Sequence, residues 1–206
     1  MAQQTSGWKT VLSVPKIYDF VQAMVGANKQ RRLLVGQHFK LFSGARVLDV
    51  GCGTGELYQY LPQDIQYTGV DLSAAYVAQA QANFGSRAKF ICADLSDCDL
   101  AALGTFDRVI GTGILHHLDD QPAHRLLEAA AKVLAPGGHL ITVDPALVDG
   151  QPRLARAVIL RDRGRNVRSP REYAALAEPY FSVVNLIIRD DLLYIPYTHC
   201  ILSCAK

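Results

Sequence analysis

Short apolar runs alternate with helical stretches along most of the chain. Five runs of aliphatic and β-branched residues each end at a glycine, an aspartate or a polar turn, at 45–50, 66–70, 88–92, 106–110 and 138–143. Spacing and composition predict helices over 55–61, 74–83 and 122–134, and a short helix or turn over 95–103. This alternation predicts a doubly wound α/β fold with a mostly parallel sheet, in which ligands bind at the carboxyl ends of the strands.

The two ends of the chain depart from this alternation. Residues 180–188 and 197–204 predict two further strands with no helix between them, which favours an antiparallel hairpin that closes the sheet edge. Ahead of the first strand, residues 15–42 predict one long helix with a break at Gly36. We therefore expect an N-terminal helical lid over 1–44 and one globular unit over 45–206.

The composition is that of a globular protein. Half of the 206 residues are hydrophobic, 19% are charged and the net charge is +2, which excludes a disordered tail and predicts neither nucleic acid nor membrane as a partner. No apolar stretch is long enough to span a bilayer and MAQQTSGWKT shows no secretory signal, so we expect a cytoplasmic protein. The five cysteines form no CxxC pair, and we interpret them as reduced thiols. We interpret Cys200 and Cys204, which share a face if their segment is a strand, as small buried residues.

The segment VLDVGCGTGEL, residues 47–57, carries the strongest chemical signal. An apolar strand runs directly into Gly51, Gly53 and Gly55, where a backbone without Cβ atoms can approach a ligand ahead of a helix N-terminus. Asp71 closes the next strand, where a carboxylate can accept both hydroxyl protons of a ribose. The glycine spacing differs from the GxGxxG of dinucleotide sites.

This loop resembles, at every position, the glycine motif VLDVGCGTG of class I S-adenosylmethionine-dependent methyltransferases. The resemblance extends over about 45–206, through GVDLS, ICADL, FDRVIGTGILHHLDD and LLEAAAKVLAPGGHLITVD. It implies a Rossmann-like sheet of seven strands with an antiparallel last strand. It also implies S-adenosyl-L-methionine as methyl donor and S-adenosyl-L-homocysteine as product.

The resemblance also implies a set of cofactor residues. They are Asp49, Gly51, Cys52, Gly53, Gly55, Asp71, Leu72, Asp94, Leu95 and Gly111. In this set the three glycines lie under the methionine part, Asp71 holds the ribose hydroxyls, and Asp94 with Leu95 frames the adenine. Asp94 alternatively only caps a turn, and Asp49 either acts in the site or anchors the loop amides.

The segment that follows the strand at 106–110 is where acceptors meet the methyl group in the family. It lacks the Asn/Asp-Pro-Pro-aromatic tetrad of enzymes that methylate nucleobase amines, and it lacks the carboxylates of metal-holding relatives, so we expect no metal. Methyl transfer from a sulfonium needs alignment and, for some acceptors, a base. His116 and His117 are the candidate bases, with His116 nearer the strand end; alternatively one packs at the helix start and the other is solvated.

An arginine-rich stretch over 145–172 lies where the family inserts substrate-recognition elements. Its seven guanidinium groups can grip a carboxylate or phosphate, although such a run is also typical of a solvated helix face. The part RDRGRNVRSPREY predicts an ordered loop. We predict a small, anionic metabolite as acceptor, methylated at oxygen or nitrogen. Its predicted contacts are Arg161, Arg163, Arg168, Tyr173 and Tyr197.

Two other classes of function stay open. A nicotinamide-dependent oxidoreductase shares the glycine loop and the ribose acid, but the glycine spacing, the absence of a Tyr-x-x-x-Lys pair and the terminal hairpin argue against it. A non-catalytic partner or sensor would keep the cofactor site and yield no methylated product. The sequence does not set the oligomeric state.

Overall fold

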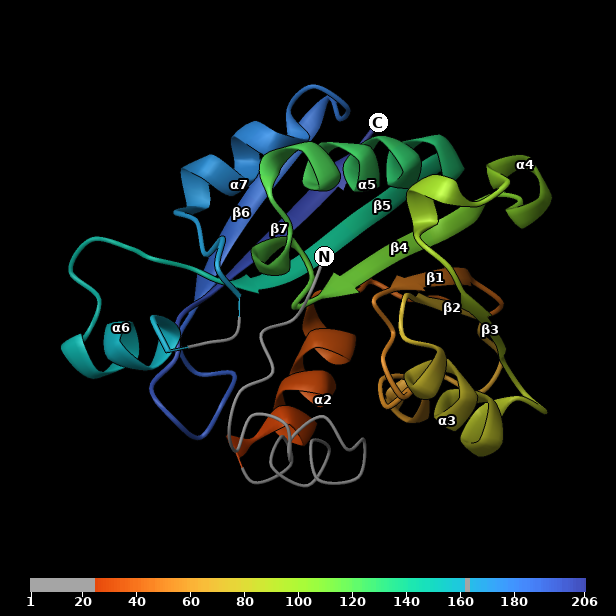
Figure 1. Cartoon of the computed structure of the whole chain (residues 1–206), viewed down its shortest axis with the longest axis horizontal. Coiled ribbons are helices and arrows are strands. Elements are labelled where there is room, and N and C mark those ends of the chain that lie inside the picture. Colours follow the sequence, from red (N-terminus) through yellow and green to blue (C-terminus); the bar gives the residue numbers. More distant parts are fainter. Residues whose placement is uncertain (1–24, 162–163) are drawn as a thin grey trace.

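A seven-stranded sheet runs through the molecule (Figure 1). The computed structural model describes residues 25–161 and 164–206. The strands are β1 (Arg46–Val50), β2 (Gln66–Asp71), β3 (Lys89–Cys92), β4 (Phe106–Thr112), β5 (Leu134–Pro145), β6 (Val183–Arg189) and β7 (His199–Ala205). They are ordered β3-β2-β1-β4-β5-β7-β6, and only β7 runs antiparallel to its neighbours. The predicted fold class is confirmed.

The antiparallel strand β7 lies inside the sheet, between β5 and β6. Ile201 of β7 pairs with Val143 on one side and with Ile187 on the other. The predicted hairpin is therefore confirmed, but the strand at the sheet edge is β6. This edge strand leaves apolar side chains of both faces partly exposed, including Leu186 and Ile187.

Helices cover both faces of the sheet. They are α2 (Ala27–Gln37), α3 (Ala74–Phe84), α4 (Leu100–Leu103), α5 (Asp120–Val133), α6 (Arg153–Ile159) and α7 (Pro170–Ala177), with 3-10 turns η3 (Tyr58–Tyr60), η4 (Leu95–Asp97) and η5 (Leu115–His117). Helices α5 and α7 lie over one face and α2 and α3 over the other, while α6 projects beside the sheet (Figure 1). Across the described ranges, none of the helices has the length and apolarity to cross a bilayer.

Two hydrophobic cores flank the sheet because successive strand residues point to opposite faces. In β1, Leu48 belongs to the core under α5 and α7, whereas its neighbour Val47 belongs to the core under α2 and α3. Cys200 and Cys204 both lie in the first core, where burial raises the pKa of each thiol to about 12. These two cysteines are small buried residues, as predicted.

The described part of the N-terminal segment forms helix α2. Residues 1–24 lie outside the described residues, so the lid prediction is not tested there. In the described part, α2 begins after Gly26, whose φ of 102° lies in the left-handed region. Gly36 lies inside α2, so the predicted break at Gly36 is wrong.

Arg108 of β4 holds the segment that follows α2. Its guanidinium is 8% exposed and donates to the carbonyl oxygens of Phe39 (3.0 Å), Lys40 (2.8 Å) and Asp107 (2.6 Å). The planar guanidinium thus fixes the turn between α2 and β1 to the amino end of β4.

The predicted helix over 55–61 is wrong, because only the turn η3 forms there. Gly55 has φ of 78°, which a right-handed helix cannot use. At the other end Leu61 is extended, with φ −79° and ψ 153°, as the residue before Pro62 prefers. The remaining residues suffice for one short turn that buries Tyr58.

Two helices form within the arginine-rich stretch, in part of which the sequence predicted a loop. In α7 the Ser169 hydroxyl accepts from the Glu172 N–H (3.3 Å), and the Glu172 carboxylate accepts from the Ser169 N–H (2.7 Å). This reciprocal capping box, with Pro170 in the first helical position, is a start signal that is readable in the sequence.

Candidate active site

The glycine loop follows β1 at the carboxyl edge of the parallel strands. Gly51, Gly53 and Gly55 all have positive φ, at 73°, 55° and 78°. A Cβ atom would lie 3.0 Å from Ile114 at Gly51 and 3.1 Å from Phe90 at Gly55, but at Gly53 it would meet no atom of the described residues within 4 Å. Packing therefore explains two of the glycines, and Gly53 is the one that faces open space for a ligand.

Asp71 ends β2 beside this loop. Its Oδ2 accepts from the N–H of Gly53 (2.9 Å) and its Oδ1 from the N–H of Ser73 (2.8 Å). Each carboxylate oxygen has a second lone pair, so the group can still accept from two hydroxyls. Leu72 is 70% exposed next to it and presents an apolar surface at the same edge.

Asp49 is a buried carboxyl group in β1, just ahead of the glycine loop. Its Oδ2 accepts from the Tyr67 hydroxyl (2.6 Å), and its buried Oδ1 has no hydrogen-bond partner among the described residues. Burial raises the pKa of Asp49 to about 7; the Tyr67 hydrogen bond opposes this shift, the charge of Asp71 adds to it and Arg31 opposes it. The unpartnered oxygen is suited to a donor group of a ligand.

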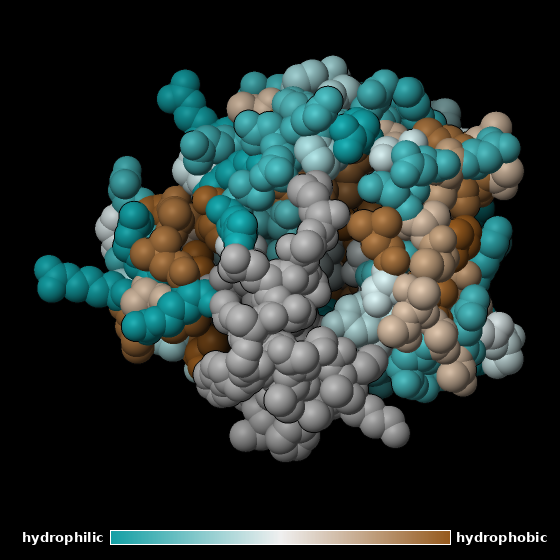
Figure 2. Space-filling model, in the orientation of Figure 1, coloured by the Kyte–Doolittle hydropathy of each residue, from teal (hydrophilic) through white to brown (hydrophobic). Residues whose placement is uncertain are grey.

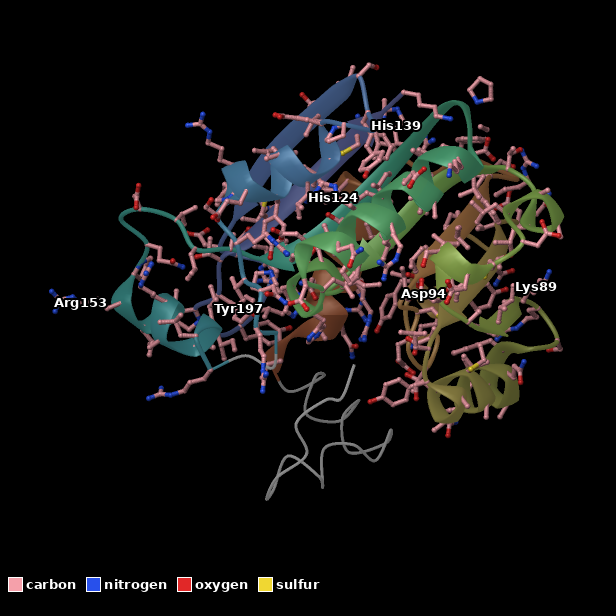
Figure 3. All side chains as sticks on the ribbon, turned by 45° about the horizontal axis from the view of Figure 1, so that its top comes forward. Lys89, Asp94, His124, His139, Arg153 and Tyr197 are labelled. Atoms are coloured by element: carbon pink, nitrogen blue, oxygen red, sulfur yellow. The ribbon has the colours of Figure 1, made fainter. Side chains whose placement is uncertain are left out.

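The adenine segment differs in part from the prediction. Oδ1 of Asp94 accepts from the N–H (2.9 Å) and hydroxyl (2.8 Å) of Ser96, so Asp94 caps η4, and its Oδ2 takes part in neither bond. The side chain of Leu95 is 2% exposed and lies in the core. Leu95 can therefore approach a ligand only through its backbone. In Figure 3, Asp94 lies on the β3 side of the molecule.

Cys52 and Gly111 pack beside the glycine loop. Burial raises the pKa of the Cys52 thiol, whose Sγ lies 3.7 Å from the carbonyl oxygen of Gly53. Gly111 lies in β4, where a Cβ atom would come within 3.0 Å of Ile114. Both residues border the loop through packing.

His116 forms a buried pair with Asp144. The histidine lies in η5 after β4 and is 5% exposed; Asp144 lies near the end of β5 and is 1% exposed. Oδ1 of Asp144 accepts from the backbone N–H of His116 (3.1 Å) and lies 2.9 Å from its Nδ1. A carboxylate at this distance favours the tautomer that carries its proton on Nδ1, which leaves the lone pair on Nε2.

Two glycines and the second histidine surround the His116 ring. A Cβ atom at Gly113 would lie 3.5 Å from Cε1, and one at Gly164 would lie 1.9 Å from Cδ2. Because Nε2 is bonded to both of these carbons, it lies on the side of the ring away from Asp144. The exposed ring of His117 packs against that of His116 with centroids 4.0 Å apart.

Arg168 is a predicted acceptor contact, but its guanidinium forms hydrogen bonds within the protein. It is 8% exposed, and its guanidinium donates to the carbonyl oxygens of Leu115 (2.9 Å) and Leu118 (2.8 Å) and to the Asp120 carboxylate (2.7 Å). This geometry argues against the predicted anion contact, because both terminal nitrogens already donate to protein oxygens. Arg168 holds the loop that carries the two histidines.

Tyr173 also lies away from any open surface. Its side chain is 1% exposed, and its hydroxyl donates to the carbonyl oxygen of Pro145 (2.9 Å) and accepts from the N–H of Arg168 (3.4 Å). Burial raises the pKa of this phenol. The structure therefore places Tyr173 in the core, and the prediction that it lines the acceptor pocket is not supported.

Two of the other three predicted acceptor residues, Arg161 and Tyr197, lie in the described part of the chain. Arg161 is exposed just after this helix, and Arg163 lies outside the described residues. Tyr197 is 8% exposed and packs against His199 with ring centroids 4.8 Å apart. Figure 3 shows Tyr197 on the α6 side of the molecule, across from Asp94.

The outer surface of α6 combines arginine and leucine side chains. Arg153 points away from the body of the molecule (Figure 3). Leu154 and Leu160 are 61% and 63% exposed, and hydrophobic residues gather in this region in Figure 2. The helix therefore presents apolar as well as cationic groups beside the carboxyl edge of the sheet.

Sequence reasoning missed Asp144 and Tyr67. An aspartate near the end of an apolar strand is the same signal that identified Asp71, so Asp144 in LITVDP could have been found. Tyr67 lies mid-strand in QYTGVD, where nothing in the sequence shows that its hydroxyl reaches Asp49.

A family model for a methyltransferase domain matches residues 47–138, from the glycine loop to the start of β5. The chain belongs to the class I S-adenosylmethionine-dependent methyltransferase family. This methyltransferase is 30% identical over 142 residues to phosphoethanolamine N-methyltransferase 1 of Triticum aestivum, which covers 67% of this chain and 28% of that protein. It is 33% identical over 135 residues to 27-O-demethylrifamycin SV methyltransferase of Amycolatopsis mediterranei, over 62% of this chain and 48% of the relative.

The fold of this methyltransferase is shared with human N-acetylserotonin methyltransferase, solved in complex with SAM. The TM-score is 0.71 at 19% identity, over 95% of this chain and 56% of that chain. The methyltransferase spans about a quarter to a half of the length of the two relatives above. S-adenosylmethionine is the cofactor of the family, and the site fits it: Gly53 leaves open space, Asp71 keeps free lone pairs and Asp49 has an unpartnered oxygen.

Proposed function

We propose that this methyltransferase moves a methyl group from S-adenosylmethionine to an oxygen or nitrogen atom of a small, anionic acceptor. The observation that carries the proposal is the buried His116–Asp144 pair, at the carboxyl ends of β4 and β5. These strands adjoin β1, which leads into the glycine loop. A base thus lies at the same edge of the sheet as the cofactor residues.

The cofactor residues have distinct tasks in this proposal. Asp71 binds the two ribose hydroxyls, and the exposed side chain of Leu72 packs against the adenine. The unpartnered Oδ1 of Asp49 accepts from the ammonium group of the methionine part. When bound, S-adenosylmethionine supplies a methyl group on a positively charged sulfur, which is already activated for displacement.

His116 acts as the general base. Its Nε2 would take the proton from the acceptor hydroxyl or amine as that acceptor atom bonds to the methyl carbon and the carbon–sulfur bond breaks, with S-adenosylhomocysteine as the leaving group. The Asp144 carboxylate would stabilise the imidazolium that results. Such a base suits acceptors that must lose a proton, and phenols and amines meet that condition, whereas a carboxylate is already ionised. His117 is exposed and packs its ring against that of His116, so we assign the proton transfer to the buried His116.

The negative charge of the acceptor is inferred from the arginines around α6. Arg168 is not counted among these arginines, because its guanidinium nitrogens donate to the loop that carries the two histidines. Arg161 is exposed and precedes Gly164 by three residues, which places its Cα within about 11 Å of that of Gly164. Gly164 in turn packs on the His116 ring, so the backbone of Arg161 is within reach of the base for an arginine side chain.

Calorimetric titration tests the cofactor assignment. Wild-type protein, Asp71→Ala and the exposed-carboxylate control Asp97→Ala are titrated with S-adenosylmethionine, S-adenosylhomocysteine and NADH. We expect both adenosyl compounds to bind the wild type and the control, and the affinity of Asp71→Ala to fall at least about tenfold, since hydrogen bonds to a charged group are lost. Binding of NADH alone would contradict the assignment and favour an oxidoreductase.

Methyl transfer tests the base and the acceptor class. Wild type, His116→Asn and His117→Asn are incubated with methyl-labelled cofactor and a metabolite extract, which is then separated by anion exchange. We expect label in the anionic fraction, at a rate reduced about 10²-fold or more in His116→Asn and little changed in His117→Asn. Label confined to neutral or cationic compounds contradicts the anionic acceptor. Cofactor binding with no labelled product favours the non-catalytic sensor.

A further inference from the structure

Residues 164–168, which we call the strap, lie across the turn that carries His116. The N–H of Asn166 donates to the carbonyl oxygen of His116 (3.0 Å). The side-chain amide of Asn166 also donates to Asp119 (3.1 Å), which caps α5. The strap is thus bonded to the turn both at the histidine itself and just beyond it.

Arg168 joins the two elements that carry the His116–Asp144 pair. Its guanidinium donates to the carbonyl oxygens of Leu115 and Leu118, one on each side of the two histidines. Its own carbonyl oxygen accepts from the N–H of Leu147 (3.2 Å), and it forms a parallel bridge with Ala146. Ala146 and Leu147 lie two and three residues after Asp144 in the chain, so Arg168 binds both the turn that carries His116 and the segment that follows Asp144.

Gly164 shows independently that the strap fits against the His116 ring. A Cβ atom there would lie 1.9 Å from His116 Cδ2 and 2.7 Å from its carbonyl oxygen. Its φ is outside the left-handed range, so close approach, and not backbone conformation, accounts for the glycine. Any side chain at this position must displace the ring or the strap.

We propose that Arg168 is a positioning residue that fixes His116 against Asp144 and so maintains the Nδ1–H tautomer of the base. This inference rests on the proposed function in one respect, which is that His116 acts as the base. The fixed, planar fork of the guanidinium can reach two carbonyl oxygens and the Asp120 carboxylate together, which the single ammonium of a lysine cannot do in the same geometry. Because the guanidinium contacts backbone and not acceptor, its role is indirect.

The test compares two buried arginines of equal exposure. Arg168→Lys is matched by Arg108→Lys, since Arg108 is also 8% exposed and also donates to backbone carbonyl oxygens, at the opposite end of β4. The tautomer of His116 is measured by long-range ¹H–¹⁵N NMR of the ring nitrogens in the folded, acceptor-free protein. Melting temperature is recorded for each variant.

We expect both lysine variants to lose thermal stability, but only Arg168→Lys to lose the dominance of the Nδ1–H tautomer. Gly164→Ala is a second route to the same loss if Arg168→Lys does not fold. An unchanged tautomer in the folded Arg168 or Gly164 variants, or an equal change in Arg108→Lys, overturns the proposal. Asp144→Asn distinguishes the positioning role of Arg168 from the proposed base. If this substitution leaves the His116 tautomer unchanged, Asp144 does not set the tautomer, and the proposed base is refuted.

Discussion

The buried carboxyl group of Asp49 makes the stability of the cofactor-free protein depend on pH. Its pKa is about 7 in the folded state and about 3.9 in an unfolded chain, so the folded state holds a proton over an interval in which the unfolded state has lost it. A raised carboxyl pKa therefore favours the folded state at low pH, and this advantage disappears as the pH rises toward 7. Integrating the difference in bound protons between the folded and unfolded states gives a loss of about 2–3 kcal/mol in the free energy of unfolding between pH 5 and pH 8.

Asp49→Asn removes the titration while keeping an acceptor for Tyr67. We expect the free energy of unfolding of the wild type, relative to this variant, to fall by about 2–3 kcal/mol from pH 5 to pH 8 and to level off above pH 7. Urea denaturation at four pH values measures the difference, in which other titrating groups cancel.

The control for this experiment is Asp64→Asn. The Ser43 hydrogen bond lowers the pKa of the exposed Asp64, so its contribution is complete above about pH 4, and the difference from wild type should stay constant from pH 5 to pH 8. A pH-independent difference for Asp49→Asn, or one that increases in favour of the wild type, would refute the reasoning.

Three further predictions concern the loop and the core. Gly55→Ala should lower the melting temperature more than Gly53→Ala, because both adopt positive φ but only Gly55 packs against aromatic rings; calorimetry should instead show the larger loss of cofactor affinity for Gly53→Ala. Tyr173→Phe should destabilise by about 1–3 kcal/mol in urea, since a buried carbonyl and a buried N–H lose the phenol; a loss below about 0.5 kcal/mol would contradict this. Tyr67→Phe should move the stability transition of Asp49 above pH 7, because the hydrogen bond that favours the ionised form is removed; an unchanged midpoint would contradict it.

The strands and the glycine loop could be predicted because their signals are local. Apolar runs of four to eight residues ending at a polar turn mark strands wherever they occur. The predicted helix over 74–83 matches α3 to within one residue, because its signals are also local. The short turn η3 that replaces the predicted helix after the loop could not be predicted from composition alone, since Gly55 and the residue before Pro62 decide the backbone there.

Side-chain roles that depend on partners far away along the chain could not be predicted from the sequence. Arg168 appeared as one cation among seven, and nothing local shows that its donors bind carbonyl oxygens about 50 residues earlier in the chain. The same applies to Tyr173, whose hydroxyl bonds to Pro145 across the core. By contrast, His116 was preferred over His117 from its distance to the strand end, and the structure gives it a buried carboxylate partner.

The place of β7 between β5 and β6 has a consequence for biosynthesis. Both β5 and β6 precede in the chain the strand that joins them, so until β7 inserts between them each keeps an unpaired backbone edge. With apolar side chains on both faces of β6, the nascent chain is open to association with other chains in this interval. The yield of folded protein should therefore depend on how quickly β7 inserts between β5 and β6.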